Sequence, residues 1–177
     1  LSPVPEASRR RLVDSLNYMR CYSIWSLIVI YLGLAVFGWL WEVAMHLITY
    51  GTFVNRGALH GPWLPIYGLG SVLILTILNR LRSHPVIEFI TAIVLCGFLE
   101  YMTSVFMEFT TGGKKWWDYS GYFLNLNGRI CAEGLLAFGL GGLAVVYVLA
   151  PLIDNIISRI NPKVLRPVCI AAAAVFL

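Results

Sequence analysis

Polar and acidic side chains stand inside stretches of this chain that are otherwise apolar. Glu42 and His46 are four residues apart, so on a helix they share one face. Glu100, Ser104 and Glu108 repeat at the same interval and form a second polar stripe. Carboxylates and imidazoles arranged in this way can bind a cation, carry protons or act as general acids and bases.

Placing these acids inside a membrane needs a physical reason. A carboxylate at the centre of a bilayer costs about 2.5–3.5 kcal/mol even on a lenient insertion scale. Three unpaired acids would cost on the order of 8–10 kcal/mol, comparable to the whole stability of a domain, about 5–15 kcal/mol. They must therefore be paired, protonated or hydrated. The candidate partners are Arg56, Arg129, His46 and His60.

The elements that carry these residues are long apolar segments. Of 177 residues, 59% are hydrophobic and 12% are charged, and the mean hydropathy is +0.77; soluble domains have about 25% charged residues. This composition excludes a disordered chain, a coiled coil and an ordinary soluble enzyme. It predicts one all-α domain over residues 1–177, a polytopic transmembrane helix bundle of four to five spans. The expected spans are 23–50, 65–81, 86–110 and 129–152, with 168–177 as the start of a fifth.

Lysine and arginine are distributed unevenly between the two sides of such a bundle. Nine lie in the N-terminal segment, between the second and third spans, or after the fourth, against four elsewhere. The positive-inside rule therefore places the N-terminus in the cytoplasm and the connections 51–64 and 111–128 outside. Leu12, Leu16 and Met19, beside three arginines, predict a cytoplasmic interfacial helix within residues 1–22.

In this orientation five of the nine acidic residues lie in the central or outer part of the bilayer or on an outer connection. Polar stripes on three helices predict one shared site that opens to the extracytoplasmic side. The alternative interpretation is a set of buried ion pairs that fixes helix packing; Arg129 and Glu133, four residues apart, can pair within their own helix. The five acids are Glu42, Glu100, Glu108, Asp118 and Glu133.

Both outer connections contain residues that favour packing into the bundle. Two prolines and three glycines in 55–68 prevent a regular helix, yet Trp63 and Tyr67 are large and apolar. Non-helical backbone at membrane depth is tolerated where it lines a cavity. The second connection carries Trp116 and Trp117, typical of a membrane interface, together with Asp118. An aromatic belt is an alternative interpretation of both segments.

Several other chemistries have weak or no support. Glu42 and His46 are weak candidates for metal ligands, because no motif with metal-ligand spacing accompanies them, and no metal is expected. Residues 112–115 lack the spacing of a nucleotide-binding loop. We expect no cofactor, and a net charge of +4 is too small and scattered to indicate nucleic acid.

At these positions the chain resembles a known bacterial family. The resemblance covers roughly residues 35–155 and rests on the strings NRGALHGPWLPIYG (55–68), EYMTSVFME (100–108), WWDYS (116–120) and NLNGRI (125–130). These look like the family called putative ABC-transporter permease, type IV. The chain departs from that pattern in having Phe138 before Gly139, where Trp is expected, and Glu133 is not part of it. The motif residues are Asn55, Arg56, His60, Trp63, Tyr67, Glu100, Glu108, Trp116, Asp118, Asn127 and Arg129.

The resemblance implies a transport subunit of the bacterial inner membrane with a candidate ATPase partner, or a homo-oligomer. In this interpretation an acidic cavity binds a small polar or cationic solute. The alternative is an enzyme at the outer leaflet that acts on a lipid or isoprenoid-linked phosphate by acid–base chemistry. Arg56 and Arg129 would hold the phosphate, Glu100 would be a carboxylate suited to acid–base work, and His46 or His60 would be the base. A third interpretation is an assembly subunit without chemistry. The candidate site residues are Glu42, His46, Asn55, Arg56, His60, Trp63, Tyr67, Glu100, Ser104, Glu108, Trp116, Trp117, Asp118, Asn127, Arg129 and Glu133.

Overall fold

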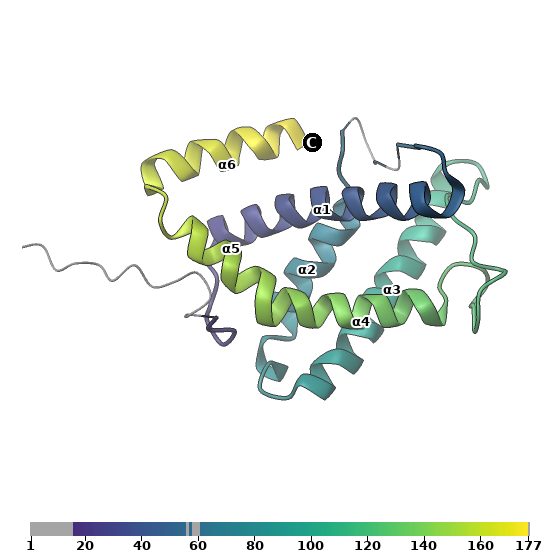
Figure 1. Ribbon diagram of the computed structural model, residues 1–177, viewed down its shortest axis with the longest axis horizontal. Helices are drawn as coiled ribbons and strands as arrows, with labels where there is room; N and C mark the ends of the chain where they lie inside the picture. The colour runs from purple at the N-terminus through teal and green to yellow at the C-terminus, as the bar shows by residue number, and fades with distance from the viewer. Residues whose placement is uncertain (1–15, 56, 58–60, 177) are drawn as a thin grey trace, which may run out of the picture.

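A computed structural model describes residues 16–55, 57 and 61–176 of the chain. Within these residues all regular elements are helices, so the all-α fold class is confirmed. Figure 1 shows α1 and the α4–α5 helix running in opposite directions along the long axis. The elements are α1 (Ile24–Tyr50), α2 (Pro65–Ile77), the 3₁₀ turn η1 (Asn79–Leu81), α3 (Pro85–Thr110), α4 (Ala132–Ala144), the π-helical turn η2 (Val145–Leu149), α5 (Ala150–Ile157) and α6 (Pro162–Phe176).

Three of the described helices are long and apolar enough to cross a membrane. They are α1, α3 and the continuous helix α4–η2–α5 over Ala132–Ile157. The ends of α1 follow from local chemistry: the Ser23 side chain accepts a hydrogen bond from the backbone N–H of Ser26, and Gly51 takes the left-handed conformation with φ of 68°. The last span begins at Ala132 rather than at 129, because Cys131 caps the helix.

The second expected span, 65–81, is shorter than expected. The α-helix α2 has 13 residues and stops at Ile77, where the chain tightens into the 3₁₀ turn η1. At about 1.5 Å per residue it is about 20 Å long, against a hydrocarbon core of about 30 Å. Pro65 at its start favours a helix that begins there, because proline has no backbone N–H to satisfy.

The short helix begins beside the middle of α1. The backbone N–H of Leu64 donates to the carbonyl of Ala35 at 2.9 Å. Two glycines permit this contact: a Cβ on Gly38 would lie 2.3 Å from the Tyr67 ring, and one on Gly68 would lie 2.4 Å from the Tyr31 carbonyl. The chain that follows α1 therefore comes back to the middle of the bundle at Leu64. This agrees with the expectation that the connection packs into the bundle.

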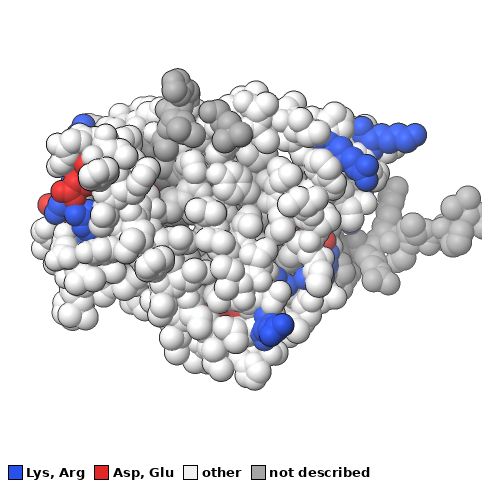
Figure 2. Space-filling model, turned by 180° about the vertical axis from the view of Figure 1, so that it is seen from behind, with Lys and Arg blue, Asp and Glu red and all other residues white. Residues whose placement is uncertain are grey.

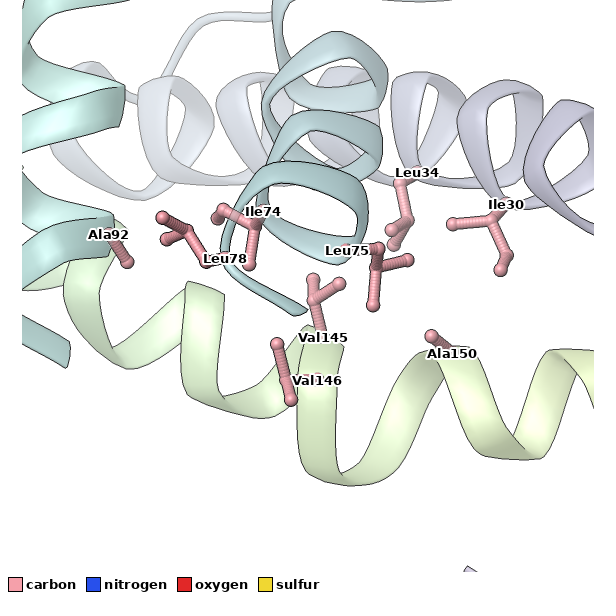
Figure 3. Close-up of a cluster of buried hydrophobic side chains, with 9 residues drawn as sticks. All are labelled: Ile30, Leu34, Ile74, Leu75, Leu78, Ala92, Val145, Val146 and Ala150. Atoms are coloured by element: carbon pink, nitrogen blue, oxygen red, sulfur yellow. The ribbon is translucent and has the colours of Figure 1, made fainter. Parts of the chain in front are cut away.

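The buried apolar core lies toward the end of the bundle where α2 finishes. Figure 3 shows side chains from α1, α2, α3 and the α4–α5 helix pointing toward one another. Many other large apolar side chains are exposed, among them Phe98 and Phe109. In Figure 2, charged groups sit at the ends and lower edge of an otherwise uncharged face. The core residues are Ile30, Leu34, Ile74, Leu75, Leu78, Ala92, Val145, Val146 and Ala150.

The two terminal parts of the described chain differ from the expected pattern. Residues 16–22 form a turn and irregular chain rather than helix; the rest of the expected interfacial helix lies outside the described residues. The helix expected from 168 begins earlier, at Pro162, and runs to Phe176 beside α1. The Phe176 ring lies 5.3 Å from the ring of Tyr31 and stacks on Trp63 at 4.9 Å.

Candidate functional site

The first acidic side chain of the site is held between α1 and α2. The Tyr67 hydroxyl donates to Glu42 Oε1 at 2.6 Å. This bond forms because α2 starts opposite the middle of α1 and brings Tyr67 to the same depth. His46, one turn further along α1, does not share that partner: its Nδ1 lies 3.1 Å from the carbonyl oxygen of Thr52.

The second acidic side chain lies deeper. Glu100 of α3 is only 6% exposed, and its Oε1 accepts a hydrogen bond from the Tyr119 hydroxyl at 3.2 Å. Its other oxygen, Oε2, is buried and has no hydrogen-bond partner among the described residues. Burial and the neighbouring carboxylates raise the pKa of Tyr119 well above its ordinary value, so this hydroxyl keeps its proton and donates.

These two pairs form one group. Glu42 and Glu100 lie close enough to interact electrostatically, and Tyr67 lies close enough to Glu100 and Tyr119 to interact with both. We call Glu42, Tyr67, Glu100 and Tyr119 the carboxylate–tyrosine cluster. It joins α1, α2, α3 and the outer connection, and its acids have phenol groups as hydrogen-bond donors.

A second polar group lies nearer the C-terminal end of α3. The Arg129 guanidinium forms an ion pair with Glu108 and donates to Ser104 Oγ at 2.9 Å. The predicted pairing of Arg129 with Glu133 is wrong, because Arg129 precedes α4 and reaches across to α3. Glu133 is exposed, and its Oε1 accepts from the backbone N–H of Phe123 at 3.4 Å.

The rest of the second outer connection is folded onto these groups. The Trp117 indole N–H donates to the Arg129 carbonyl at 3.0 Å, and Asn127 Nδ2 donates to the Tyr101 hydroxyl at 2.9 Å. Asp118 accepts a hydrogen bond from the Ser120 backbone N–H at 3.0 Å. Bonds from the Ser120 hydroxyl and backbone N–H lower the pKa of this exposed carboxyl. Trp116 is half exposed and makes none of the bonds that hold the two polar groups together.

The first outer connection contributes a further polar contact. The Trp39 indole N–H donates to Asn55 Oδ1 at 2.8 Å, and the same oxygen accepts from the backbone N–H of Gly57 at 3.0 Å. Trp63 stacks on Phe176, and its indole N–H is buried and unpartnered within the described chain. The predicted site residues Arg56 and His60 lie outside the described residues.

A groove runs between α1 and α6, apart from the acidic residues. It has a volume of about 460 Å³ and is lined almost entirely by apolar side chains, including Leu32, Val36, Trp63 and Val175. None of the four cluster residues lines it. Within the described part of the chain, no group of three histidine, cysteine or acidic side chains is arranged to hold a metal ion.

Sequence reasoning missed two features. Tyr119 stood inside the string WWDYS but was not singled out, because a tyrosine near an interface is ordinary. Arg82 and Glu88, at the other end of the bundle, were also missed, although both are almost completely buried. The signal for Glu88 was an acidic residue within the apolar run that forms α3.

The comparison with known families is consistent with this architecture. A family model described as putative ABC-transporter type IV matches residues 29–177. No curated protein and no solved structure matches the chain. The matched region contains every described helix except the first turn of α1, and with it both polar groups of the site. The chain therefore belongs to the putative ABC-transporter type IV family.

Proposed function

We propose that this membrane protein is a transport-type subunit whose carboxylate–tyrosine cluster binds a small cationic or polar solute from the extracytoplasmic side. One observation carries the proposal: Glu100 Oε2 is buried inside a cluster with two acids, and no described residue satisfies it. A buried carboxylate needs a proton, a cation or a hydrogen-bond donor. A transported solute can supply the last two.

The backbone around the cluster supports the same function. The chain leaves α1 at Gly51, and Leu64 is bonded to Ala35 at the middle of α1, where the shortened α2 starts. Broken helices and irregular backbone at membrane depth occur where they line a solute path or are buried in protein. Tyr67, in the first turn of α2, connects the start of this helix directly to Glu42.

A complete transport pathway calls for more protein than this bundle. The described chain has three long spans and one short apolar helix. The family to which the chain belongs is named for ABC transporters, so we propose that an ATPase subunit or a second copy completes the assembly. The setting we propose is the bacterial plasma membrane, with the charge-rich connections on the cytoplasmic face.

The enzyme hypothesis has less support. It needed Arg129 to hold a phosphate, but this guanidinium is already paired with Glu108 and bonded to Ser104. Binding a phosphate there would leave the half-buried Glu108 carboxylate without its cation, which is costly. The network around Arg129 therefore supports a structural role that holds α3 against the outer connection.

A binding experiment tests the proposal. The full chain is reconstituted in nanodiscs and its thermal unfolding is followed with sodium, potassium, ammonium or putrescine chloride as probes. A ligand at about 100 times its Kd stabilises the folded state by about 2.7 kcal/mol. We expect one class of cation to raise the unfolding temperature saturably, with an apparent affinity at least about tenfold weaker in Glu100→Gln.

The matched control is Glu133→Gln, which removes an exposed acid on the same side of the bundle. It should bind the cation as the wild type does. Equal responses of the wild type and Glu100→Gln to every probe would contradict the proposal. Purification from the native host, with identification of any ATPase in stoichiometric amount, tests the partner separately.

A further inference from the structure

A second buried acid lies at the opposite end of α3 from the outer network. Glu88, in the first turn of α3, is 0% exposed. Neither of its carboxylate oxygens has a hydrogen-bond partner in the described part of the chain. A carboxylate sealed from water without a hydrogen bond or a close counter-ion strongly disfavours its ionised form.

A buried cation lies near Glu88 but is occupied elsewhere. Arg82 is 3% exposed, and its Nη1 donates to the carbonyls of Tyr18 at 3.0 Å and Arg20 at 2.8 Å. Its Nη2 donates to the carbonyl of Leu75 in α2. We call Arg82 with these three carbonyls the Arg82 latch, because it connects the segment before α1 to α2.

The backbone of Arg82 makes a further contact, with η2. The carbonyl oxygen of Arg82 accepts a hydrogen bond from the Tyr147 hydroxyl of η2 at 2.7 Å. The guanidinium lies over the Tyr22 ring, with its central carbon 5.5 Å from the ring centroid. Its Nε is buried and has no hydrogen-bond partner within the described residues. Of the five N–H donors of the guanidinium, these contacts use three, so Nε–H and one N–H of Nη2 stay available.

The other ionisable groups around this site are already engaged or neutral. Glu88 faces Arg82 from the connection before α3 and Tyr147 from η2; His84, one turn before it, is exposed. Arg20, near the latch, forms an ion pair with Asp154 at 2.8 Å and a hydrogen bond to Asn155 at 2.8 Å. Arg82 is therefore the cation best placed to meet an ionised Glu88.

We propose that Glu88 is a proton-binding site at the inner end of the bundle, and that its ionisation releases the Arg82 latch. The protonated acid is neutral and leaves Arg82 on the three carbonyls. When the proton passes to water at the inner surface, the buried carboxylate needs a counter-charge. The Arg82 guanidinium turns to it and gives up its bonds to Tyr18 and Arg20. The segment before α1 then separates from the C-terminal end of α2.

The proposed role of Glu88 and the Arg82 latch depends only on the contacts at this end of the bundle. It does not require the carboxylate–tyrosine cluster to bind a solute. If the chain is a transport subunit, ionisation of Glu88 opens the inner end of the bundle, and the solute site at Glu100 lies further along α3. Glu88 and Glu100 are both on α3, so a single helix carries one acid in its first turn and another near its middle. Failure of solute binding at Glu100 would leave the inference about Glu88 unaffected, and the reverse also holds.

Infrared spectroscopy tests the protonation directly. The full chain in nanodiscs is titrated from about pH 5 to about pH 9, the range that covers buried glutamates, in the Glu42→Gln/Glu100→Gln background. We expect the carbonyl band of a protonated carboxylic acid in an apolar environment at low pH, and its loss as the pH rises. Absence of this band at every pH would overturn the proposal, and this test does not require a Glu88 variant to fold.

A distance measurement tests the release. Spin labels are placed at Met19→Cys and Ile77→Cys, both exposed, after the native cysteines are replaced by alanine. In the wild-type background we expect the distance between the labels to lengthen over the same pH range. In Glu88→Gln it should stay short at every pH, and the Glu133→Gln control should follow the wild type. A distance that is independent of pH, or a Glu88→Gln variant that opens like the wild type, would overturn the inference.

Discussion

Arg129 and Glu108, 21 positions apart in the sequence, form an ion pair that holds the connection before α4 against the C-terminal end of α3. The two side chains are 14% and 27% exposed. The same guanidinium also donates to Ser104, one turn inward from Glu108. At this end of the bundle, a side chain from an irregular segment is therefore held by two polar residues on one face of a regular helix.

We expect the ion pair to be important for stability. Arg129→Ala leaves Glu108 half-buried without its cation, and we expect a loss of about 2 kcal/mol, between the values for exposed and fully buried pairs. The measurement is reversible unfolding in mixed micelles, followed by tryptophan fluorescence. The double variant Arg129→Ala/Glu108→Ala should cost less than the sum of the two single variants.

The control for this cycle is Glu133→Gln, which removes the acid that sequence spacing paired with Arg129. It should change the free energy of unfolding by less than about 0.5 kcal/mol. If Glu133→Gln were as destabilising as Glu108→Ala, or if the two losses in the cycle simply added, the ion pair would have no special role.

The two phenols of the carboxylate–tyrosine cluster should differ in importance. Tyr67→Phe removes a donor 2.6 Å from Glu42, and hydrogen bonds to charged groups contribute about 1.5–3 kcal/mol. Tyr119→Phe removes a longer bond, 3.2 Å from Glu100, so we expect a smaller loss of about 1 kcal/mol. Tyr50→Phe, at an exposed position on α1, serves as the control. Equal stability of all three variants would show that neither bond holds the cluster together.

Much of this fold follows from the apolar pattern. Two expected spans, 23–50 and 86–110, agree with α1 and α3 to within one residue at each end. Each is a long apolar run bounded by a strong local signal, Ser23 and Gly51 for α1 and Pro85 for α3. The shortening of α2 was not predictable in the same way. Residues 78–81 include both apolar and polar side chains, and such a sequence is compatible with either a helix or a turn.

The composition of the site was more predictable than its pairing. The spacing of Glu100, Ser104 and Glu108 correctly placed three polar groups on one face of α3. Their partners, Tyr119 and Arg129, come from an irregular connection, where no period relates a residue to its neighbours in space. Helical spacing instead favoured the local pair of Arg129 with Glu133, but α4 starts only at Ala132 and Arg129 pairs with Glu108 of α3.

Close packing of α1 against Tyr67 provides a third prediction. A Cβ on Gly38 would lie 2.3 Å from Tyr67 Cγ, so Gly38→Ala must push the ring away and break its bond to Glu42. We expect a loss of about 1–3 kcal/mol, typical of overpacking, together with weaker binding of any cation by the cluster. Gly33→Ala is the matched control on the same helix, because nothing lies within 4 Å of its Cβ. Similar unfolding free energies for the two variants would refute this packing.

Acid should loosen the outer connection through Asp118. Hydrogen bonds from Ser120 hold the pKa of this carboxyl below its ordinary value, which is about 3.9. The stabilisation is therefore fully present above that ordinary value and is lost as the pH falls through the lower, folded value.

We expect the Ser120 amide, bonded to Asp118 at 3.0 Å, to be protected from hydrogen exchange at neutral pH. It should become unprotected in acid, after correction for the intrinsic exchange rate. In Asp118→Asn it should exchange faster already at neutral pH, while the Thr111 amide, bonded to the carbonyl of Met107, keeps its protection in both proteins. Protection of Ser120 that is the same in both proteins at neutral pH would show that Asp118 does not order this connection.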